Sequence, residues 1–184
     1  MPQDNRGESI MERGCVQIYT GNGKGKTTAM LGLALRARGA GLKVYIGQFA
    51  KCGDYCEIKA IKKYLPDIVV EQYGEGYKIN CEITESDIKS AKNGFRKAVE
   101  AMCSGKYDVI MLDEINIAVH LGFLTVEEVL NMIKIKPAGV ELVLTGRYAK
   151  DEIISAADLV SEIVEVKHYF NCGDHLAARE GIEK

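Results

Sequence analysis

Residues 20–28 read TGNGKGKTT and follow directly on the apolar run CVQIY. The stretch is close to the phosphate-binding pattern G-x-x-x-x-G-K-[ST], in which a glycine-rich turn joins a strand to a helix. Thr20 stands where that pattern begins with glycine, whereas GKT at residues 25–27 fits its end. Such a turn gathers backbone N–H groups, a lysine ammonium and the positive end of a helix around one anion, which a ligand-free turn would not require. The predicted nucleotide-binding residues of the loop are Gly21, Asn22, Gly23, Lys24, Gly25, Lys26, Thr27 and Thr28.

A second motif, YDVIMLDE at residues 107–114, ends an apolar run with two acidic side chains. A carboxylate at the end of such a strand can hold the Mg²⁺ that the hydroxyl of a phosphate-binding loop also reaches. The alternative is that Asp113 caps the amino end of a following helix. Because the loop lies upstream, metal binding is the favoured interpretation, with the hydroxyl of Thr27 and one carboxylate of the Asp113-Glu114 pair as the predicted ligands. In a hydrolase, Glu114 would be suspected of activating water.

Apolar runs rich in β-branched residues recur along the chain and predict six strands. They cover residues 15–19, 43–49, 68–72, 108–112, 140–145 and 159–166, and most are apolar enough for burial on both faces. Helical patterns separate them at residues 26–38, 84–102, 125–133 and 149–157, and two of these open with the capping patterns Thr84/Asp87 and Thr125/Glu128. This alternation predicts an α/β fold, a mostly parallel central sheet with helices on both faces.

Composition bounds the class of protein. The chain has 184 residues, 47% hydrophobic and 27% charged, with a formal net charge of −2. It is therefore expected to be a soluble domain without a positive field for nucleic acid or an anionic membrane. No apolar run of the sequence approaches the roughly 20 residues that cross a bilayer, and the polar start is unlike a signal peptide. We expect a flexible arm over residues 1–14, one domain over residues 15–184, and a cytoplasmic location.

Six cysteines are scattered without the paired spacing of a zinc site or a disulfide framework. Cys15 and Cys103 lie in apolar contexts and are expected in the core. Cys52 and Cys56 flank a short gap in what reads as a polar loop, without a second pair nearby to complete four ligands. A further Cys/His cluster near the end of the chain comprises His168, Cys172 and His175. Metal binding is the minor alternative for both groups.

Several companions of hydrolases and kinases are missing from the sequence. It contains no N-K-x-D segment of the kind that reads guanine, and no arginine-rich lid of the kind that small kinases close over phosphates. Arg147, in LTGR directly after a predicted strand, is placed to reach a nucleotide, with a surface salt bridge as the alternative. The predicted site is therefore poorly equipped for phosphoryl transfer.

Five segments, in this order, carry a family resemblance: TGNGKGKTTAMLGLALRARGAG, QFAKCG, VIMLDEIN, VLTGR and EVKHYFNCGDHLAAREGIE. They resemble the P-loop type of ATP:corrinoid adenosyltransferases of the bacterial cobalamin pathway, from about Cys15 to the end of the chain. The last segment is the most telling. Its Lys-His pair, its aromatic-Asn pair and its terminal Gly-Ile-acidic run are not general features of proteins that hydrolyse nucleotides.

The resemblance implies a RecA-like P-loop fold in which ATP is held in reverse, with its terminal phosphate in the loop. Reduced Co(I) then attacks the ribose C5′, the adenosyl group passes to the corrinoid, and inorganic triphosphate leaves. Family members also carry threonine in the first loop position, which accounts for Thr20. The resemblance further implies Mg²⁺ (or Mn²⁺) held by Thr27 and Glu114 with Asp113 in support, and a catalytic set of Lys26, Thr27 and Glu114. It also implies a homodimer and an electron donor such as a flavodoxin-type reductant.

One segment departs from the family pattern. The family commonly carries a phenylalanine and a tryptophan that help to strip the lower axial ligand from cobalt. Here residues 73–79 read YGEGYKI, with Tyr77 and Ile79 in those positions, and we still expect corrinoid contact. Further contacts with nucleotide or corrinoid are expected from His168, Tyr169, Phe170 and Asn171. Two alternatives stay open: a P-loop ATPase or kinase module, and a carrier that binds both ligands without turnover.

Overall fold

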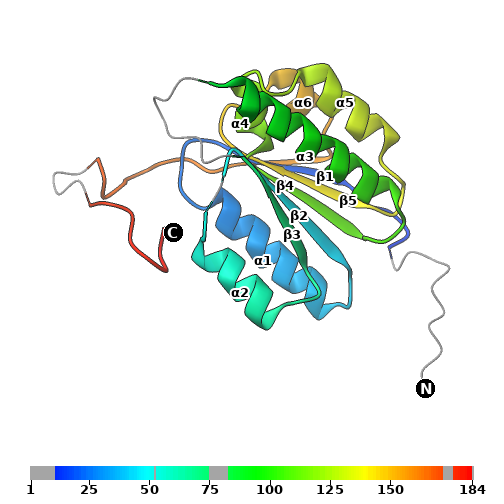
Figure 1. Cartoon of the computed structure of the whole chain (residues 1–184), viewed down its shortest axis with the longest axis horizontal. Coiled ribbons are helices and arrows are strands. Elements are labelled where there is room, and N and C mark those ends of the chain that lie inside the picture. The colour runs from blue at the N-terminus through cyan, green and yellow to red at the C-terminus, as the bar shows by residue number, and fades with distance from the viewer. Residues whose placement is uncertain (1–10, 52, 75–82, 172–175, 184) are drawn as a thin grey trace.

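Six parallel strands form one sheet in the spatial order β3-β2-β4-β5-β1-β6 (Figure 1). The computed structural model describes residues 11–51, 53–74, 83–171 and 176–183. The strands are β1 (Val16–Thr20), β2 (Val44–Phe49), β3 (Val69–Tyr73), β4 (Val109–Asp113), β5 (Glu141–Thr145) and β6 (Leu159–Glu162). The helices are α1 (Lys26–Gly39), α2 (Cys56–Tyr64), α3 (Glu85–Cys103), α4 (Ile115–His120), α5 (Val126–Ile135) and α6 (Asp151–Ser155).

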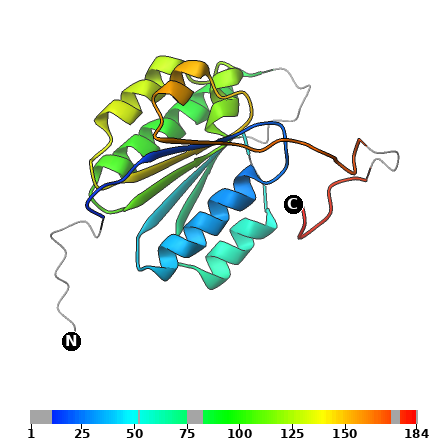
Figure 2. The same ribbon diagram turned by 180° about the vertical axis from the view of Figure 1, so that it is seen from behind.

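Helices cover both faces of the sheet, which gives three layers (Figures 1 and 2). α1 and α2 lie on one face, where Met30 and Ile61 belong to the same buried cluster as Met111 of β4. The other helices lie on the opposite face, where Phe95 of α3 packs in a cluster with Leu112. Full burial of side chains of this size stabilises the fold by about 1.5–3 kcal/mol each. The prediction of a parallel α/β fold with helices on both faces is confirmed.

The local sequence explains where the main elements form. Every residue of β2 and β4 is buried, as near-continuous apolar runs in the middle of a parallel sheet require. α3 and α5 each begin with a complete capping box, made by Thr84 with Asp87 and by Thr125 with Glu128. Both predicted helix starts are therefore confirmed.

Two helices and one strand end differ from the sequence predictions. α2 begins at Cys56, inside the stretch that reads as a polar loop, because only Ile58 and Ile61 of this helix are buried and the apolar signal is weak. α4 has six residues, too few for a periodic pattern. β6 ends at Glu162 instead of continuing to residue 166. Its four residues are exposed because it is the edge strand beyond β1.

The prediction that Cys103 belongs to the core is wrong, and Cys15 is only half-buried. Cys103 ends α3 one residue after the fully buried Met102. One residue corresponds to about 100° around a helix, so the two neighbours point in different directions.

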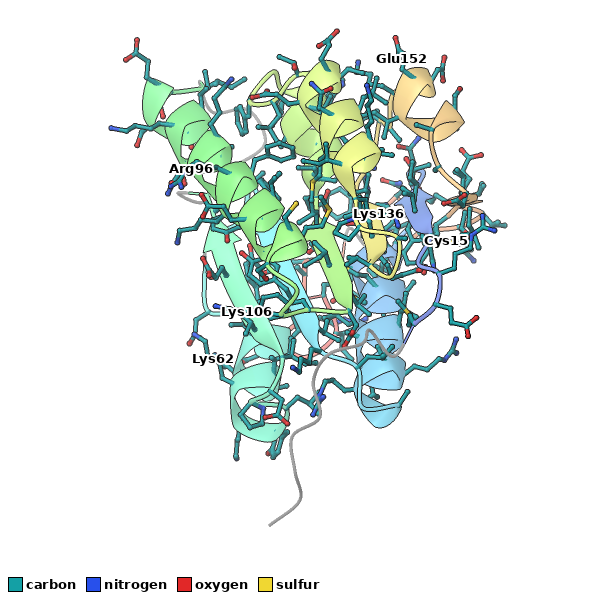
Figure 3. The ribbon with its side chains drawn as sticks, turned by 90° about the vertical axis from the view of Figure 1, so that its right-hand side faces the viewer. Cys15, Lys62, Arg96, Lys106, Lys136 and Glu152 are labelled. Atoms are coloured by element: carbon teal, nitrogen blue, oxygen red, sulfur yellow. The ribbon has the colours of Figure 1, made fainter. Side chains whose placement is uncertain are left out.

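The strand order decides which loops meet. Because all strands are parallel, β1, β2, β4 and β5 end at one edge of the sheet, and β4 lies between β2 and β5. The opposite edge, where the strands begin, carries Cys15 and Lys136 (Figure 3). There the Lys136 ammonium donates to the carbonyl oxygens of Gly14 and Val140, at 2.8 Å each. The loop of residues 20–25, Asp113 and Glu114 lie at the first edge.

Candidate functional site

The loop of residues 20–25 joins β1 to α1 at the edge where the strands end (Figure 2). Gly25 is the N-cap of α1, with φ of 125°, and has no side chain to bond the N–H groups of the first turn. These donors are the ones that commonly bind phosphate. Lys26 is 6% exposed, and its Nζ donates to the carbonyl oxygens of Gly21 and Gly23, at 2.7 Å each. An ammonium has three N–H donors, so one remains for a phosphate.

The chain directly after β6 holds this loop in place. Ile163 donates its N–H to the carbonyl oxygen of Thr20 at 2.9 Å, and its own carbonyl accepts from Gly23 at 2.7 Å. At Gly21, where φ is 95°, a Cβ would lie 2.5 Å from the carbonyl oxygen of Ile163. Glycine is therefore required here by the neighbouring segment as well as by any phosphate, and only the second reason could be predicted from the sequence.

The carboxylate of Asp113 is the centre of a buried hydrogen-bond network at the end of β4. The residue is fully buried. Its Oδ1 accepts from the hydroxyls of Thr27 at 3.0 Å and Thr145 at 2.7 Å. Its Oδ2 accepts from Lys51 Nζ at 2.7 Å and from Gln48 Nε2 at 3.2 Å. The structure thus brings together the hydroxyl of Thr27 and the carboxylate of Asp113, as predicted from the two sequence motifs.

Glu114 follows in a left-handed backbone conformation, with φ of 59°. It is the N-cap of α4, so the alternative that Asp113 caps this helix is wrong. The Glu114 N–H donates to Thr145 Oγ1 at 3.0 Å. Ala50 and Tyr148 also have positive φ, 53° and 61°, and lie just past the ends of β2 and β5. Such conformations cost about 1–3 kcal/mol each and gather at functional sites.

The charges of this edge are strongly coupled. Burial raises the pKa of Glu114, and the neighbouring Asp113 carboxylate raises it further, against the opposing charges of Lys51, Lys26 and Arg147. Burial lowers the pKa of Lys26. Burial would also lower the pKa of Lys51, but its contacts with Asp113 prevail and raise it. The site therefore combines cations that suit an anionic ligand with two carboxylates whose repulsion a divalent cation would relieve.

Three exposed side-chain contacts complete the surroundings of the loop. Arg147 donates from Nη2 to the carbonyl oxygen of Asn22 at 3.1 Å, so this arginine lies beside the loop. On the other side, Lys24 Nζ lies 3.2 Å from the hydroxyl of Tyr169 and 3.0 Å from Oε1 of Glu183. The C-terminal segment thus reaches the loop through Tyr169.

The neighbours of Tyr169 that were predicted to border the ligands have local partners. His168 Nδ1 accepts from the N–H of Phe170 at 3.1 Å. Asn171 Nδ2 donates to Oε1 of Glu165 at 2.6 Å, and Phe170 is 53% exposed. Contact of these three residues with nucleotide or corrinoid remains a prediction.

Several other predicted residues lie outside the described ranges. They are Tyr77 and Ile79 of the expected corrinoid segment and Cys52, Cys172 and His175 of the candidate metal groups. Within the described ranges, no cluster of three or more His, Cys, Asp or Glu side chains could hold a metal ion. A metal held by Thr27, Asp113 and Glu114 would therefore also need ligands from substrate or water, which is usual for Mg²⁺.

Three residues of the Asp113 network were not found from the sequence: Gln48, Lys51 and Thr145. Each lies at or just after the end of β2 or β5, the two strands that flank β4. Side chains at the ends of neighbouring parallel strands meet at one edge. These residues belong to the segments QFAKCG and VLTGR, which carry the family resemblance. Their contact with Asp113 could not be predicted without knowing which strands are neighbours.

Comparison with known proteins places the chain in a family. The sequence profile of the ATP:corrinoid adenosyltransferases BtuR/CobO/CobP matches residues 12–183. The chain belongs to this family. It is 34% identical over 173 residues to a corrinoid adenosyltransferase of Pseudomonas aeruginosa, an alignment that covers 94% of this chain and 84% of the relative. The corrinoid adenosyltransferase of Escherichia coli K12 is 33% identical, and CobA of Salmonella typhimurium is 31% identical. Both alignments span 172 residues and cover 94% of this chain and 86% of the relative.

The donor atoms of this adenosyltransferase fit Mg²⁺. The hydroxyl of Thr27 and the carboxylates of Asp113 and Glu114 supply hard oxygen atoms, the type that Mg²⁺ prefers. The ammonium of Lys51 already forms an ion pair with the central carboxylate, that of Asp113. The residues present at this edge are thus suited to a cation.

Proposed function

We propose that this member of the ATP:corrinoid adenosyltransferase family transfers the 5′-deoxyadenosyl group of ATP to the Co(I) of a corrinoid at the loop of residues 20–25. The observation that supports this location is the 3.0 Å contact between the Thr27 hydroxyl and the buried Asp113 carboxylate. It joins the start of α1, which suits phosphate, to a strand end that suits a metal. The P-loop ATPase or kinase alternative is not favoured, because the relatives are corrinoid adenosyltransferases.

In this proposal ATP lies with its terminal phosphate in the loop and its ribose C5′ directed away from it. The electron pair of Co(I) forms the cobalt–carbon bond as the C5′–O bond breaks, and the triphosphate leaves with the electrons of that bond. The loop N–H groups, Lys26 and Arg147 stabilise the charge that develops on the leaving group. Holding the two reactants in line supplies the rest of the rate enhancement.

Thr27 and Glu114, supported by Asp113, are the proposed ligands of Mg²⁺ (or Mn²⁺). When bound, the ion adds positive charge to the triphosphate and so makes it a better leaving group. Glu114 has no need to activate water in this scheme. The positive charges of Lys51, Lys26 and Arg147 lie near its carboxylate and favour its ionised form.

The corrinoid is proposed to lie against residues 73–79, with Tyr77 and Ile79 as the apolar contacts. Tyr73, which begins this segment, is firmly held: a Cβ at Gly94 of α3 would lie 2.1 Å from its Cγ. The Tyr73 hydroxyl also donates to Glu71 at 2.9 Å. The segment therefore leaves the sheet from a fixed point.

We also propose a homodimer and, as the source of Co(I), a flavodoxin-type electron donor. A homodimer predicts sedimentation at about twice 20.2 kDa. A cytoplasmic location belongs to the same proposal. In the ranges that the structure describes, no helix has both the length and the apolar character needed to span a bilayer.

The direct test is anaerobic incubation with ATP, Mg²⁺ and chemically reduced cob(I)alamin, followed by its visible spectrum and by analysis of the phosphate product. We expect adenosylcobalamin and inorganic triphosphate in equal amounts. Orthophosphate without a cobalt–carbon bond would instead show a P-loop ATPase. Binding of both ligands without product would show a carrier and direct attention to Ile79.

A further inference from the structure

Lys51 places a positive charge beside Thr27 and Asp113, two of the three residues proposed to hold the metal. Its Nζ lies 2.7 Å from Oδ2 of Asp113 and 3.2 Å from Oγ1 of Thr27. The carboxylate is fully buried and the Lys51 side chain is 20% exposed, so the pair is shielded from solvent. This ammonium contacts the Thr27 hydroxyl and the supporting Asp113 carboxylate of the proposed metal site.

The backbone directs Lys51 into this position. Ala50, immediately before it, has φ of 53°, a conformation that alanine adopts at a cost. On the other side, a Cβ at Gly74 would lie 3.0 Å from the Lys51 nitrogen and 3.1 Å from its carbonyl oxygen. The residue after β3 therefore packs closely against the backbone of Lys51. This packing holds the strained turn at Ala50, from which the Lys51 side chain extends to Asp113.

The Asp113 carboxylate has no remaining place for a metal while Lys51 is present. A carboxylate offers about four lone-pair directions, and Asp113 accepts from four donors, which are Thr27, Thr145, Gln48 and Lys51. Of these donors, Lys51 carries the positive charge and has the long, flexible stem. A divalent cation that approached Thr27 and Oδ2 would repel this ammonium.

We propose that Lys51 is an internal counter-cation, which fills the metal position of the nucleotide-free protein and moves onto the triphosphate when Mg²⁺ arrives with ATP. Without nucleotide, the ammonium excludes the metal. With nucleotide, the phosphate oxygens give the ammonium a new partner, and Mg²⁺ takes its place on Asp113. Metal binding thereby depends on ATP. This inference rests on the proposed Mg²⁺ site but not on the identity of the group that ATP donates.

The test is a titration of the full-length, nucleotide-free protein with Mn²⁺, in which electron paramagnetic resonance measures the free ion. We expect weak binding to wild type and at least ~10-fold tighter binding to Lys51→Met, a ratio that corresponds to about 1.4 kcal/mol. Lys92→Met is the matched control, because Lys92 forms an exposed ion pair with Glu128 between α3 and α5. This variant should bind Mn²⁺ as wild type does.

Two further measurements sharpen the result. Adding Asp113→Asn to Lys51→Met should abolish the gained affinity, which would locate the ion at Asp113. With ATP present the order should reverse, because Lys51→Met loses its phosphate contact and should bind Mn²⁺–ATP more weakly than wild type. Lys51→Gln, which keeps an N–H donor for Asp113 without the charge, replaces Lys51→Met if that variant does not fold.

Tight Mn²⁺ binding to nucleotide-free wild type would overturn the inference, as would unchanged or weaker binding to a folded, neutral Lys51 variant. The proposed function fails by a separate observation, the absence of adenosylcobalamin from wild type in the anaerobic assay. The two results are independent of each other.

Discussion

Lys26 is nearly buried and bonds to two carbonyl oxygens of its own loop. It therefore acts on the shape of the loop as well as on its charge. Replacement by methionine, which keeps the length of the side chain, removes both effects.

We expect Lys26→Met to lower kcat/KM for adenosylcobalamin formation by roughly 10²–10³, the usual effect of losing one donor to a developing charge, and to weaken ATP binding in calorimetry. Lys106→Met is the control, since Lys106 lies at the edge where the strands begin (Figure 3). Activity within a few-fold of wild type for Lys26→Met would exclude the loop as the site of the leaving group.

The second prediction at the residue scale concerns Glu114, whose pKa is raised by burial and by Asp113. Between the unfolded value, about 4.3, and the raised folded value, the folded protein binds more protons than the unfolded chain. Its stability therefore falls as pH rises through this window. We expect Glu114→Gln to be more stable than wild type at pH 7, with a difference that shrinks as pH falls toward 4.

Urea unfolding in EDTA between pH 4 and pH 8 measures this difference. Glu100→Gln serves as control, because Glu100 forms an exposed ion pair with Arg96 and exposed pairs contribute about 0–1 kcal/mol. If Glu114→Gln were less stable than wild type at pH 7, the pKa of Glu114 would not be raised by folding.

At the scale of elements, the loop and the chain after β6 form one unit. Ile163 bonds to Thr20 and Gly23, and a side chain at Gly21 would meet it. Gly32, in the middle of α1, offers a contrast because a Cβ there would meet nothing within 4 Å.

We expect Gly21→Ala to lower the free energy of unfolding by about 2 kcal/mol or more, through positive φ and the clash with Ile163. Gly32→Ala should raise it by about 0.5–1 kcal/mol, the helix preference of alanine over glycine. Chemical denaturation measures both. Equal effects of the two substitutions would show that Ile163 does not constrain the loop.

Some helices and strands could be predicted from the sequence and others could not. Long, strongly patterned segments were placed within one or two residues, and the capping boxes at Thr84 and Thr125 fixed two helix starts. α2 and α4 were missed because one has two buried apolar residues and the other is a single short segment. The contact of Thr27 with Asp113 followed from motif knowledge. Lys51 did not, because its neighbourhood depends on β2 lying beside β4, and local patterns do not encode strand order.

For the whole molecule, the coupled charges at one edge make folding stability depend on ligands. A ligand that binds only the folded state at 100 times its Kd adds about 2.7 kcal/mol. For a chain of this size that corresponds to a rise in Tm of roughly 5–11 °C.

We therefore expect ATP with Mg²⁺ to raise Tm by this amount, and ATP with EDTA to raise it distinctly less. Differential scanning calorimetry measures both shifts. In Asp113→Asn the two shifts should become equal, since the variant lacks the central carboxylate. If ATP raises the Tm of wild type equally with Mg²⁺ and with EDTA, the metal does not bind at Thr27, Asp113 and Glu114.

The position of β1 in the sheet has a consequence for synthesis on the ribosome. β1 pairs with β5 and β6, the two strands made last, although it is itself made first. The nascent strand and its glycine-rich loop must wait for more than a hundred further residues before either sheet partner emerges. Pairings that distant in sequence form slowly, and an unpaired apolar strand is prone to wrong association. The loop proposed to bind ATP is therefore among the first parts of the chain to be translated and among the last to be assembled.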